Sequence, residues 1–447
     1  MYDPLKHQSP GTNQPYPNSY WADNSGKPPE NLGAINSDID VDVAIIGSGY
    51  TGLSCALHLA KEHNIQAHIV EANQTAWGCS GRNAGFILKS TGRKPYSEML
   101  KQWGKQITHG IYDEVCEGVD TVSQLIQTGI DCDAQSKGYL RVAHKPSMIK
   151  SLHQQSKLLK EEFNYSTEIL TREAIRADYF NSQDAFAAIR FDDCYGINPL
   201  KLAWGYQKIA QDAGVKIHTG SPVIHWEETP QKKQTLRTPN GVITANKVVI
   251  ASNGYTPKQF HLSVDNRTLP VLSQIIVTEP LTDQQLAETN FVTDNVVMDT
   301  RALKYYFRKL PDNRILFGGR GAISGKDADN PYFANRLLNV LRKSFPPLHS
   351  INLDYSWSGW ISISLDDLPH ICQADSHGKV FYSAGYCGNG VSFAVQAGKR
   401  LAQRVAGVEV PTLPFYTKEL PKFPFAKFRR LGQWGYFHYG MVKDRWL

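Results

Sequence analysis

The pattern of apolar and polar positions first becomes regular after residue 40. Residues 41–46 form a short β-branched run of the kind that is buried in a parallel sheet. Helical periodicity follows from Thr51 to about His63, and a second strand pattern covers residues 66–71. A strand, a tight turn, a helix and another strand in this order predict one βαβ unit.

The rest of the chain carries further elements of both types. A hairpin is expected from Val223 through Leu236 to Ile243, with Asn240-Gly241 as its turn. Alternation over residues 270–320 predicts an antiparallel sheet. Helices are expected at 96–130, 147–163, 200–213 and 391–405, and strands at 214–218, 247–252 and 380–384.

A glycine-rich turn connects the first strand to the first helix. It consists of Gly47, Ser48, Gly49, Tyr50, Thr51 and Gly52. In this context the first glycine permits the tight turn, the second lets a pyrophosphate approach, and the third allows close packing of helix on strand. Glu71 ends the second strand, where a carboxylate accepts hydrogen bonds from ribose hydroxyls and repels a 2′-phosphate. The turn therefore predicts a dinucleotide site.

A second loop of small residues follows shortly after Glu71 and Ala72. It consists of Gly78, Cys79, Ser80, Gly81, Arg82, Asn83, Ala84, Gly85 and Phe86. Its backbone can lie against a flat ring or a phosphate, and Arg82 can neutralise the second phosphate of a dinucleotide. An ordinary flexible loop with an exposed arginine is the alternative. The fingerprint itself does not distinguish FAD from NAD, because enzymes of both kinds use it.

Together with later motifs, these loops resemble the family of D-amino-acid oxidase, glycine oxidase and sarcosine oxidase. The closest likeness is to the γ-glutamylputrescine oxidase branch, which shares the Ser19-Tyr20-Trp21 arm and the aromatic C-terminal tail. The later motifs, in chain order, are Gly196-Ile197-Asn198-Pro199, Gly214-Val215 leading to Val223, Ala251-Ser252-Asn253-Gly254, Asp366-Asp367-Leu368-Pro369 and Gly385-Tyr386-Cys387-Gly388-Asn389-Gly390.

The resemblance implies FAD as the cofactor and assigns residues to each part of it. Val223 would contact the adenine, and Ala251, Asn253 and Gly254 would line the adenosine half. The segment Gly385, Tyr386, Gly388, Asn389, Gly390 and Val391 would begin the final helix and direct its N–H groups at the flavin.

Three positions depart from the family pattern. Sarcosine oxidases attach flavin through a Cys where this chain has Gly359, so we expect non-covalent FAD. They also hold the substrate carboxylate with a Lys where this chain has Ser392, which favours a different amine. Asn389 replaces a common His, and its amide donates hydrogen bonds but does not titrate.

The predicted reaction is oxidation of a small primary or secondary amine, such as a γ-glutamylputrescine-like compound. Hydride transfer to flavin N5 would give an imine that hydrolyses, and O₂ or another acceptor would reoxidise the flavin. Tyr306 and Arg308 resemble a family strand that faces the substrate, and Gln274 and Asn389 are further candidates for positioning it. Arg308 would anchor a carboxylate. No general base is assigned, and Trp360 is expected to pack in the core or on the flavin.

Other functions stay open at this point. One is oxidation of an amino acid or cyclic imino acid such as glycine or pipecolate. A second is a dehydrogenase or non-catalytic flavoprotein, and a third is an NAD-dependent dehydrogenase, which would leave the later motifs unexplained.

The expected fold is α/β, with a Rossmann-type FAD-binding domain assembled from separated segments and an inserted α+β substrate domain that contains an antiparallel sheet. The predicted division is an arm at 1–40, the FAD-binding domain at 41–95, 172–260 and 355–410, the substrate domain at 96–171 and 261–354, and a tail at 411–447.

Composition narrows the class further. Hydrophobic residues make up 41% and charged residues 20% of the 447 residues, which is typical of globular proteins. The net charge of +6 is spread along the chain and predicts no nucleic-acid partner. Seven scattered Cys and a polar N-terminus favour a cytoplasmic protein with no membrane span, and the 14 His show no metal spacing. We expect a monomer or small homo-oligomer.

Overall fold

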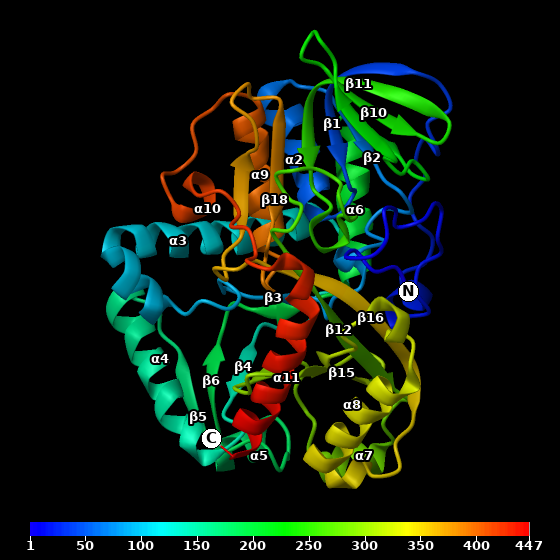
Figure 1. The fold of residues 1–447 in the computed structure, drawn as a ribbon. Coiled ribbons are helices and arrows are strands. Elements are labelled where there is room, and N and C mark those ends of the chain that lie inside the picture. Colours follow the sequence, from blue (N-terminus) through cyan, green and yellow to red (C-terminus); the bar gives the residue numbers. More distant parts are fainter. Residues whose placement is uncertain (447) are drawn as a thin grey trace.

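The computed structural model describes residues 1–446 and contains two large sheets stacked along its length (Figure 1). The first sheet is built on parallel pairing of β1 with its neighbours, and one hairpin extends it. Its order is β17 (His370–Gln373), β18 (Val380–Ala384), β11 (Gly241–Ile250), β1 (Ile39–Ile46), β2 (Ala67–Val70) and β8 (Lys216–His218), with β10 (Gln234–Thr238) and β9 (His225–Glu228) paired beyond β11.

Three helices cover the first sheet: α2 (Tyr50–His63), α6 (Pro199–Asp212) and α9 (Phe393–Val405). Their apolar faces share one core with β1 and β2, because strands buried on both sides leave no polar face. α2 and α9 pack closely at Gly398, where a Cβ would lie 2.4 Å from the Cβ of Ser54 and 2.6 Å from the carbonyl oxygen of Thr51.

The second sheet is antiparallel except at the β13–β4 pair, which is parallel. α8 (Pro331–Ser344) and α7 (Asp283–Thr289) cover one face of it, and α4 (Ile149–Phe163) packs near β5 and β6. Its order is β16 (Leu353–Ile363), β12 (Leu269–Thr278), β15 (Ile315–Arg320), β14 (Tyr306–Lys309), β13 (Val296–Asp299), β4 (Tyr139–Val142), β6 (Ala187–Phe191) and β5 (Glu168–Thr171).

The remaining elements connect the two sheets. α3 (Tyr96–Gln127) crosses between them and is interrupted at Gly104, whose φ is 74°. α11 (Arg429–Trp446) lies across the front of the second sheet (Figure 1). The others are α1 (Tyr20–Asn24), α5 (Arg172–Asp178), α10 (Pro414–Thr417), the β3 (Phe86–Ile87) and β7 (Tyr195–Gly196) pair, and 3₁₀ turns at 79–81, 146–148, 253–255, 325–327, 346–348 and 426–428.

The sequence predicted most of these elements, including the first βαβ unit and the antiparallel sheet over 270–320. The hairpin turn was wrong by one position: Thr238 pairs with Gly241, so Pro239 and Asn240 are its central residues and Gly241 already belongs to the strand. The segment 247–252 is not a separate strand but continues β11, because that strand pairs first with β10 and then with β1. The helix predicted from about Val391 is α9 and begins at Phe393, two residues later than predicted, and α11 lies in the tail for which no helix was predicted.

Membership of the two sheets differs from the predicted segments at two strands. β6 lies inside 172–260 and β16 covers the start of 355–410, and both belong to the second sheet. Short apolar strands of both sheets look alike in sequence, because periodicity reports burial and not the partner strand. The division into domains remains a prediction.

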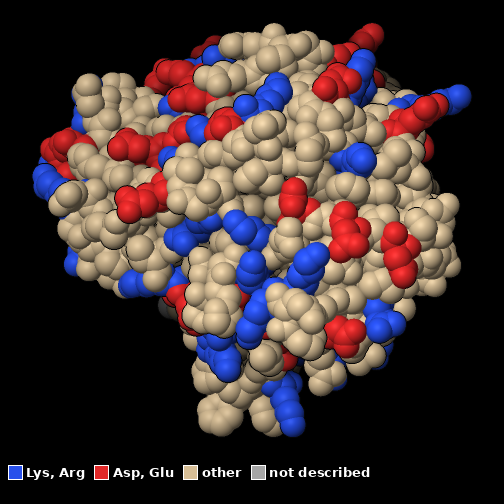
Figure 2. Space-filling model, turned by 90° about the horizontal axis from the view of Figure 1, so that it is seen from above, with Lys and Arg blue, Asp and Glu red and all other residues tan. Residues whose placement is uncertain are grey.

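Two surface properties bear on partners. Among residues 1–446, no helix has the length and apolar character needed to cross a bilayer. Figure 2 shows acidic and basic side chains intermingled over the upper part of the face seen from above, and several Lys and Arg side chains gathered below its centre.

The contact at Gly398 yields a test of the helix pair. We expect Gly398→Ala to lower the thermal midpoint, because the new methyl group overlaps backbone of α2, and such overpacking costs about 1–3 kcal/mol. Gly435→Ala on the exposed side of α11 is the matched control, since its Cβ meets no atom within 4 Å. It should leave the midpoint unchanged or raise it. Equal midpoints for Gly398→Ala and the wild type would contradict the packing.

Candidate active site

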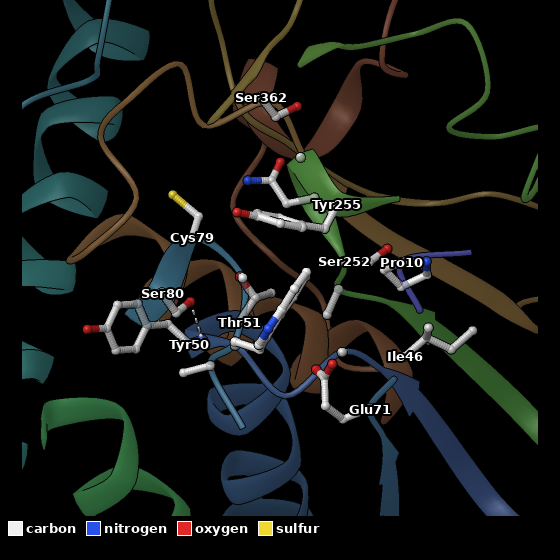
Figure 3. A pocket seen from close by; sticks show the side chains of 18 of the residues that line it. Pro10, Ile46, Tyr50, Thr51, Glu71, Cys79, Ser80, Ser252, Tyr255 and Ser362 are labelled. Carbon is white, nitrogen blue, oxygen red and sulfur yellow. Dashed lines mark hydrogen bonds between the residues drawn. The ribbon is translucent and has the colours of Figure 1, made fainter. Parts of the chain in front are cut away.

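An elongated cavity of about 1280 Å³, counting space continuous with solvent, lies where β1, β2 and β11 end. Figure 3 shows Glu71 at one end and Ser362 at the other, with Thr51, Ser80 and Cys79 between them. Its lining comes from the N-terminal arm, both glycine loops, the end of β11 and strand β16. A site beyond the carboxyl ends of parallel strands is where open α/β sheets bind their ligands.

The first glycine loop shows why each glycine is needed. Gly47 has φ 106°, and its N–H donates to the carbonyl oxygen of Val70 at 2.9 Å. A Cβ on Gly52 would lie 2.0 Å from the carbonyl oxygen of Gly47, so only glycine lets α2 start this close to the turn. Gly49 caps α2 without a side-chain bond, and the N–H of Tyr50 donates to Ser80 Oγ at 3.1 Å. The positive end of α2 thus faces the cavity.

Glu71 is held at the cavity wall by the same loop. Its Oε2 accepts from the N–H and the hydroxyl of Ser48, both at 2.9 Å, and its Oε1 accepts from the N–H of Asn73 at 3.0 Å. Burial raises the pKa of this carboxyl, and the hydrogen bonds from Ser48 and Asn73 oppose that rise. A fixed acceptor here suits a ribose diol.

The second loop is organised by Asn83. Its Nδ2 donates to the carbonyl oxygens of Cys79 and Ser80, and its Oδ1 accepts from the N–H of Gly85 at 2.7 Å. These bonds fold the loop so that Cys79, Ser80 and Asn83 line the cavity.

Arg82 does not take the predicted position opposite a phosphate. Its Nε donates to the carbonyl oxygen of Trp77 at 2.6 Å, and its guanidinium lies 4.3 Å from the centre of the Trp77 ring. Arg82 is buried and does not line the cavity. It instead joins the loop to β16, because its guanidinium donates to the carbonyl oxygen of Ser358 at 3.4 Å.

The C-terminal glycine loop joins the first loop across the cavity. The hydroxyl of Tyr386 lies 2.6 Å from Thr51 Oγ1 and 2.7 Å from Ser383 Oγ. A Cβ on Gly388 or Gly390 would meet protein only at 3.9 and 4.0 Å, so both positions leave space in the cavity that a side chain would fill. Asn389 instead turns away and donates to the carbonyl oxygen of Ser90.

Most of the predicted cofactor residues meet at this one cavity. Those that line it are Gly47, Gly49, Tyr50, Thr51, Glu71, Ala72, Gly78, Ser80, Asn83, Val223, Ala251, Asn253, Gly254, Tyr386, Gly388, Gly390 and Val391. Those outside the lining are Ser48, Gly52, Gly81, Arg82, Ala84, Gly85, Gly385 and Asn389, several of which shape the loops from behind.

Arg308 is not available as the predicted carboxylate anchor. Its side chain is 1% exposed, and its guanidinium donates to the side-chain oxygen of Gln135 and the carbonyl oxygen of Ile197. Burial lowers its pKa to about 9. A ligand would have to displace these bonds, because the side chain already fills the space beside Gly85 and Gly196.

Two other predicted pocket residues are also occupied by internal contacts. Gln274 is buried and bonds to Ser356 at 2.7 Å and Ser358 at 2.8 Å. Trp360 is fully buried, and its ring N–H donates to the carbonyl oxygen of Tyr2 at 2.8 Å, so it serves the core.

Tyr306 is half-buried on one face of the second sheet, unlike the three residues above, which are buried. Its hydroxyl lies 2.7 Å from Ser273 Oγ, and its ring fills the space above Gly318, which has no Cβ to block it. Burial raises the pKa of Tyr306 to about 12, so the phenol stays protonated at neutral pH.

Several lining residues had no motif to mark them. Trp77 and Tyr255 each stand next to a predicted motif, so adjacency was a usable signal. Pro10 comes from the N-terminal arm, and Ile361 and Ser362 come from β16. No local pattern indicates these three, since only the tertiary fold brings them here.

With this geometry in place, the comparisons define the class of protein. The model of the family described as FAD dependent oxidoreductase (DAO) matches residues 42–404, so the chain belongs to that family and is an FAD-dependent oxidoreductase.

Three of the similar proteins match this chain over most of its length. It is 30% identical over 399 residues to gamma-glutamylputrescine oxidoreductase of Escherichia coli K12, covering 89% of this chain and 90% of the relative. Glycine oxidase of Bacillus subtilis is 22% identical over 379 residues, covering 83% and 94%. Glycine oxidase from Geobacillus kaustophilus shares the fold, with a TM-score of 0.71 at 18% identity, covering 86% of this chain and 99% of that one.

The residues present fit FAD. One end of the cavity has a hydrogen-bond acceptor for ribose, the middle has the N-terminus of α2, and the far end has two glycines whose missing side chains leave room for a flat ring. Burial raises the pKa of Cys79 and of Cys387 to about 11, so neither thiol is ionised at neutral pH. Non-covalent attachment remains our prediction.

The Tyr386 hydroxyl offers a test of the link across the cavity. Tyr386→Phe should weaken FAD binding about 5- to 30-fold, since it leaves the buried hydroxyls of Thr51 and Ser383 without this partner. Titration of apoprotein with FAD, followed by fluorescence, measures the change. Tyr332→Phe, at a 62% exposed position, should bind FAD as the wild type does. Unchanged affinity in Tyr386→Phe would rule out a role for this link.

The motif before β17 yields a pH prediction. His370 Nε2 lies 3.0 Å from Asp366 Oδ1; burial disfavours the imidazolium, but the bond to Asp366 outweighs it and raises the pKa of His370 to about 9. A raised pKa contributes stability that is complete below about pH 6.5 and is lost as pH rises through 9. The hydrogen bond from His370 lowers the pKa of Asp366 against the effect of burial. The stability that the Asp366 carboxylate contributes is therefore lost as pH falls below 3.8.

We therefore expect the difference in thermal midpoint between wild type and His370→Gln to be largest near pH 6 and to shrink by pH 10. Other titrating groups cancel in this difference. A difference that is equal at both pH values would show that His370 is neutral in the folded protein.

Proposed function

We propose that the protein oxidises a small amine, with a γ-glutamylputrescine-like primary or secondary amine as the leading substrate. The observation that carries the proposal is that the cavity extends from Glu71 at the first sheet to Ile361 and Ser362 of β16 in the second sheet. A substrate placed against that sheet would meet the end of the cavity where the C-terminal glycine loop lies. The 30% identity to gamma-glutamylputrescine oxidoreductase over nearly the full chain supports the choice of amine.

The chain's own residues would orient the substrate and exclude water. Tyr306 holds a protonated hydroxyl beside Ser273, so it offers a hydrogen bond and does not accept a proton at neutral pH. Phe86, 5.9 Å from the Tyr306 ring, is buried beside it and keeps that side apolar. FAD, when bound, supplies the acceptor for the hydride of the C–N carbon.

The product follows from this chemistry. Loss of hydride from the carbon next to nitrogen leaves an iminium ion, which loses a proton to water to give the imine. After release, water hydrolyses the imine to a carbonyl compound and ammonia from a primary amine, or a smaller amine from a secondary one. O₂ or another acceptor would take up the electrons. All seven cysteines are free, which supports the further proposal of a cytoplasmic location.

The decisive experiment is anaerobic mixing of the purified yellow holoprotein with a panel of amines. γ-Glutamylputrescine, putrescine, pipecolate, glycine and sarcosine should be compared at equal concentration. We expect the visible absorbance of the oxidised flavin to bleach fastest with γ-glutamylputrescine. No bleaching by any amine would reject amine oxidation, and fastest bleaching by pipecolate or glycine would move the substrate to the amino or imino acids.

A further inference from the structure

The outer side of α11 and the turn before it carry a cluster of exposed apolar side chains. Of the fifteen large apolar side chains that are exposed among residues 1–445, eight lie between Phe425 and Val442. Single exposed apolar residues are normal on a protein surface, but a concentration of them marks an interaction site. The proposed reaction gives this cluster no role.

Helix geometry places the α11 part of the cluster on one face. The face consists of Leu431, Trp434, Met441 and Val442, whose spacing along the chain follows the turn of a helix. All four side chains are between 47% and 63% exposed. His438 lies on the same face, and the centre of its ring is 4.0 Å from that of Trp434. The face therefore presents a continuous apolar and aromatic stripe.

The opposite side of α11 is fastened to the rest of the protein at both ends. At the start of the helix, Arg430 forms an ion pair with Asp3 at 2.9 Å. At its end, Asp444 accepts a hydrogen bond from the N–H of Leu303 at 3.0 Å. Gly440 is buried against Leu303, where a Cβ would lie 2.7 Å from Leu303 Cγ. The apolar stripe therefore cannot turn inward unless these contacts break.

The segment that carries the cluster is also strongly basic. Residues 422–445 contain six Lys and Arg residues and a single acidic residue, Asp444. Lys422, Lys427 and Lys443 are exposed, whereas the Asp444 carboxylate is bonded to backbone N–H groups. The Lys and Arg side chains gathered below the centre of Figure 2 lie toward the side on which α11 stands in front in Figure 1. An occupant of this surface must therefore combine negative charge with an apolar contact layer.

A second copy of this chain lacks that combination. A two-fold contact through α11 would set the basic segment against the same basic segment of the partner, and like charges across an interface repel. A bilayer that contains anionic lipids has negative headgroups above an apolar layer. Trp, Phe and Leu side chains of an interfacial helix enter the boundary between the two, and Lys and Arg side chains reach the headgroups. The bilayer surface fits both properties of the segment.

We propose that residues 422–445 dock the protein on the surface of an anionic phospholipid bilayer, with α11 lying flat on it. Leu431 and Trp434 enter the boundary between headgroups and acyl chains, together with the apolar residues one and two turns further along. Lys422, Lys427 and Lys443 lie among the headgroups. The docking does not depend on which amine is oxidised, because the described residues of α11 contribute nothing to the lining of the cofactor cavity.

Flotation of the full-length holoprotein with lipid vesicles tests the proposal. Vesicles of phosphatidylcholine and phosphatidylglycerol in equal parts should carry the protein, and vesicles of phosphatidylcholine alone should carry much less of it. Added salt should release part of the bound protein, because it screens the headgroup charge. Trp434→Gln should lower the partition coefficient about 3- to 30-fold, since the indole ring no longer enters the bilayer.

Charge variants test the basic side of the segment separately. The double variant Lys422→Gln/Lys427→Gln should lower binding to the anionic vesicles about 5- to 50-fold and leave the weak binding to phosphatidylcholine unchanged. Matched controls come from the first sheet: Ile224→Gln, at an exposed position beside β10, and Lys232→Gln/Lys233→Gln, in the turn between β9 and β10. Both controls should bind vesicles as the wild type does. If Trp434→Gln does not fold, the double variant carries the same comparison.

Three results would overturn the bilayer docking. The first is a wild-type protein that floats with neither kind of vesicle. The second is equal flotation of the wild type, Trp434→Gln and the double lysine variant. The third is a dimer in analytical ultracentrifugation that Trp434→Gln separates, together with no vesicle binding, which would assign the surface to a second copy of the chain. None of these results bears on amine oxidation, because anaerobic flavin bleaching tests that activity without lipid.

Discussion

The close start of α2 on β1 is the constraint on which the rest of this structure depends. Because Gly52 lies against the Gly47 carbonyl, the N-terminal end of α2 faces the cavity, and Gly49, Tyr50 and Thr51 line it. Gly398 then lets α9 lie against α2, so the two glycine loops at the helix starts meet. The hydroxyl of Tyr386 joins them at Thr51. One set of close backbone approaches therefore builds both ends of the cofactor site.

This dependence explains what the sequence could predict. The glycine fingerprint and Glu71 are local, since their roles are set within a single βαβ unit, and their lining positions follow from it. The antiparallel sheet was also predictable, because alternation reports a half-buried strand. Residues such as Pro10 and Ser362 reach the cavity only through long-range packing, which no local pattern encodes.

Arg82 and Arg308 show the limit most clearly. Both are arginines in motif-like surroundings, and both suggested an anion partner. In the structure each guanidinium donates to oxygens of the protein itself: Arg82 to the carbonyl oxygens of Trp77 and Ser358, and Arg308 to the carbonyl oxygen of Ile197 and the side-chain oxygen of Gln135. An arginine that binds a ligand and one that braces a loop have the same sequence signature, and only the hydrogen-bond partners distinguish them.

The account's central claim is that one continuous site runs from Glu71, past the start of α2, to the Tyr306 face of the second sheet. A crystal structure of the holoprotein tests it most directly. We expect the FAD ribose at Glu71 and the flavin ring beside Gly388 and Gly390, with one face of the ring toward Tyr306. A flavin ring that lies away from these glycines, or one that turns its open face away from Tyr306, would contradict the account.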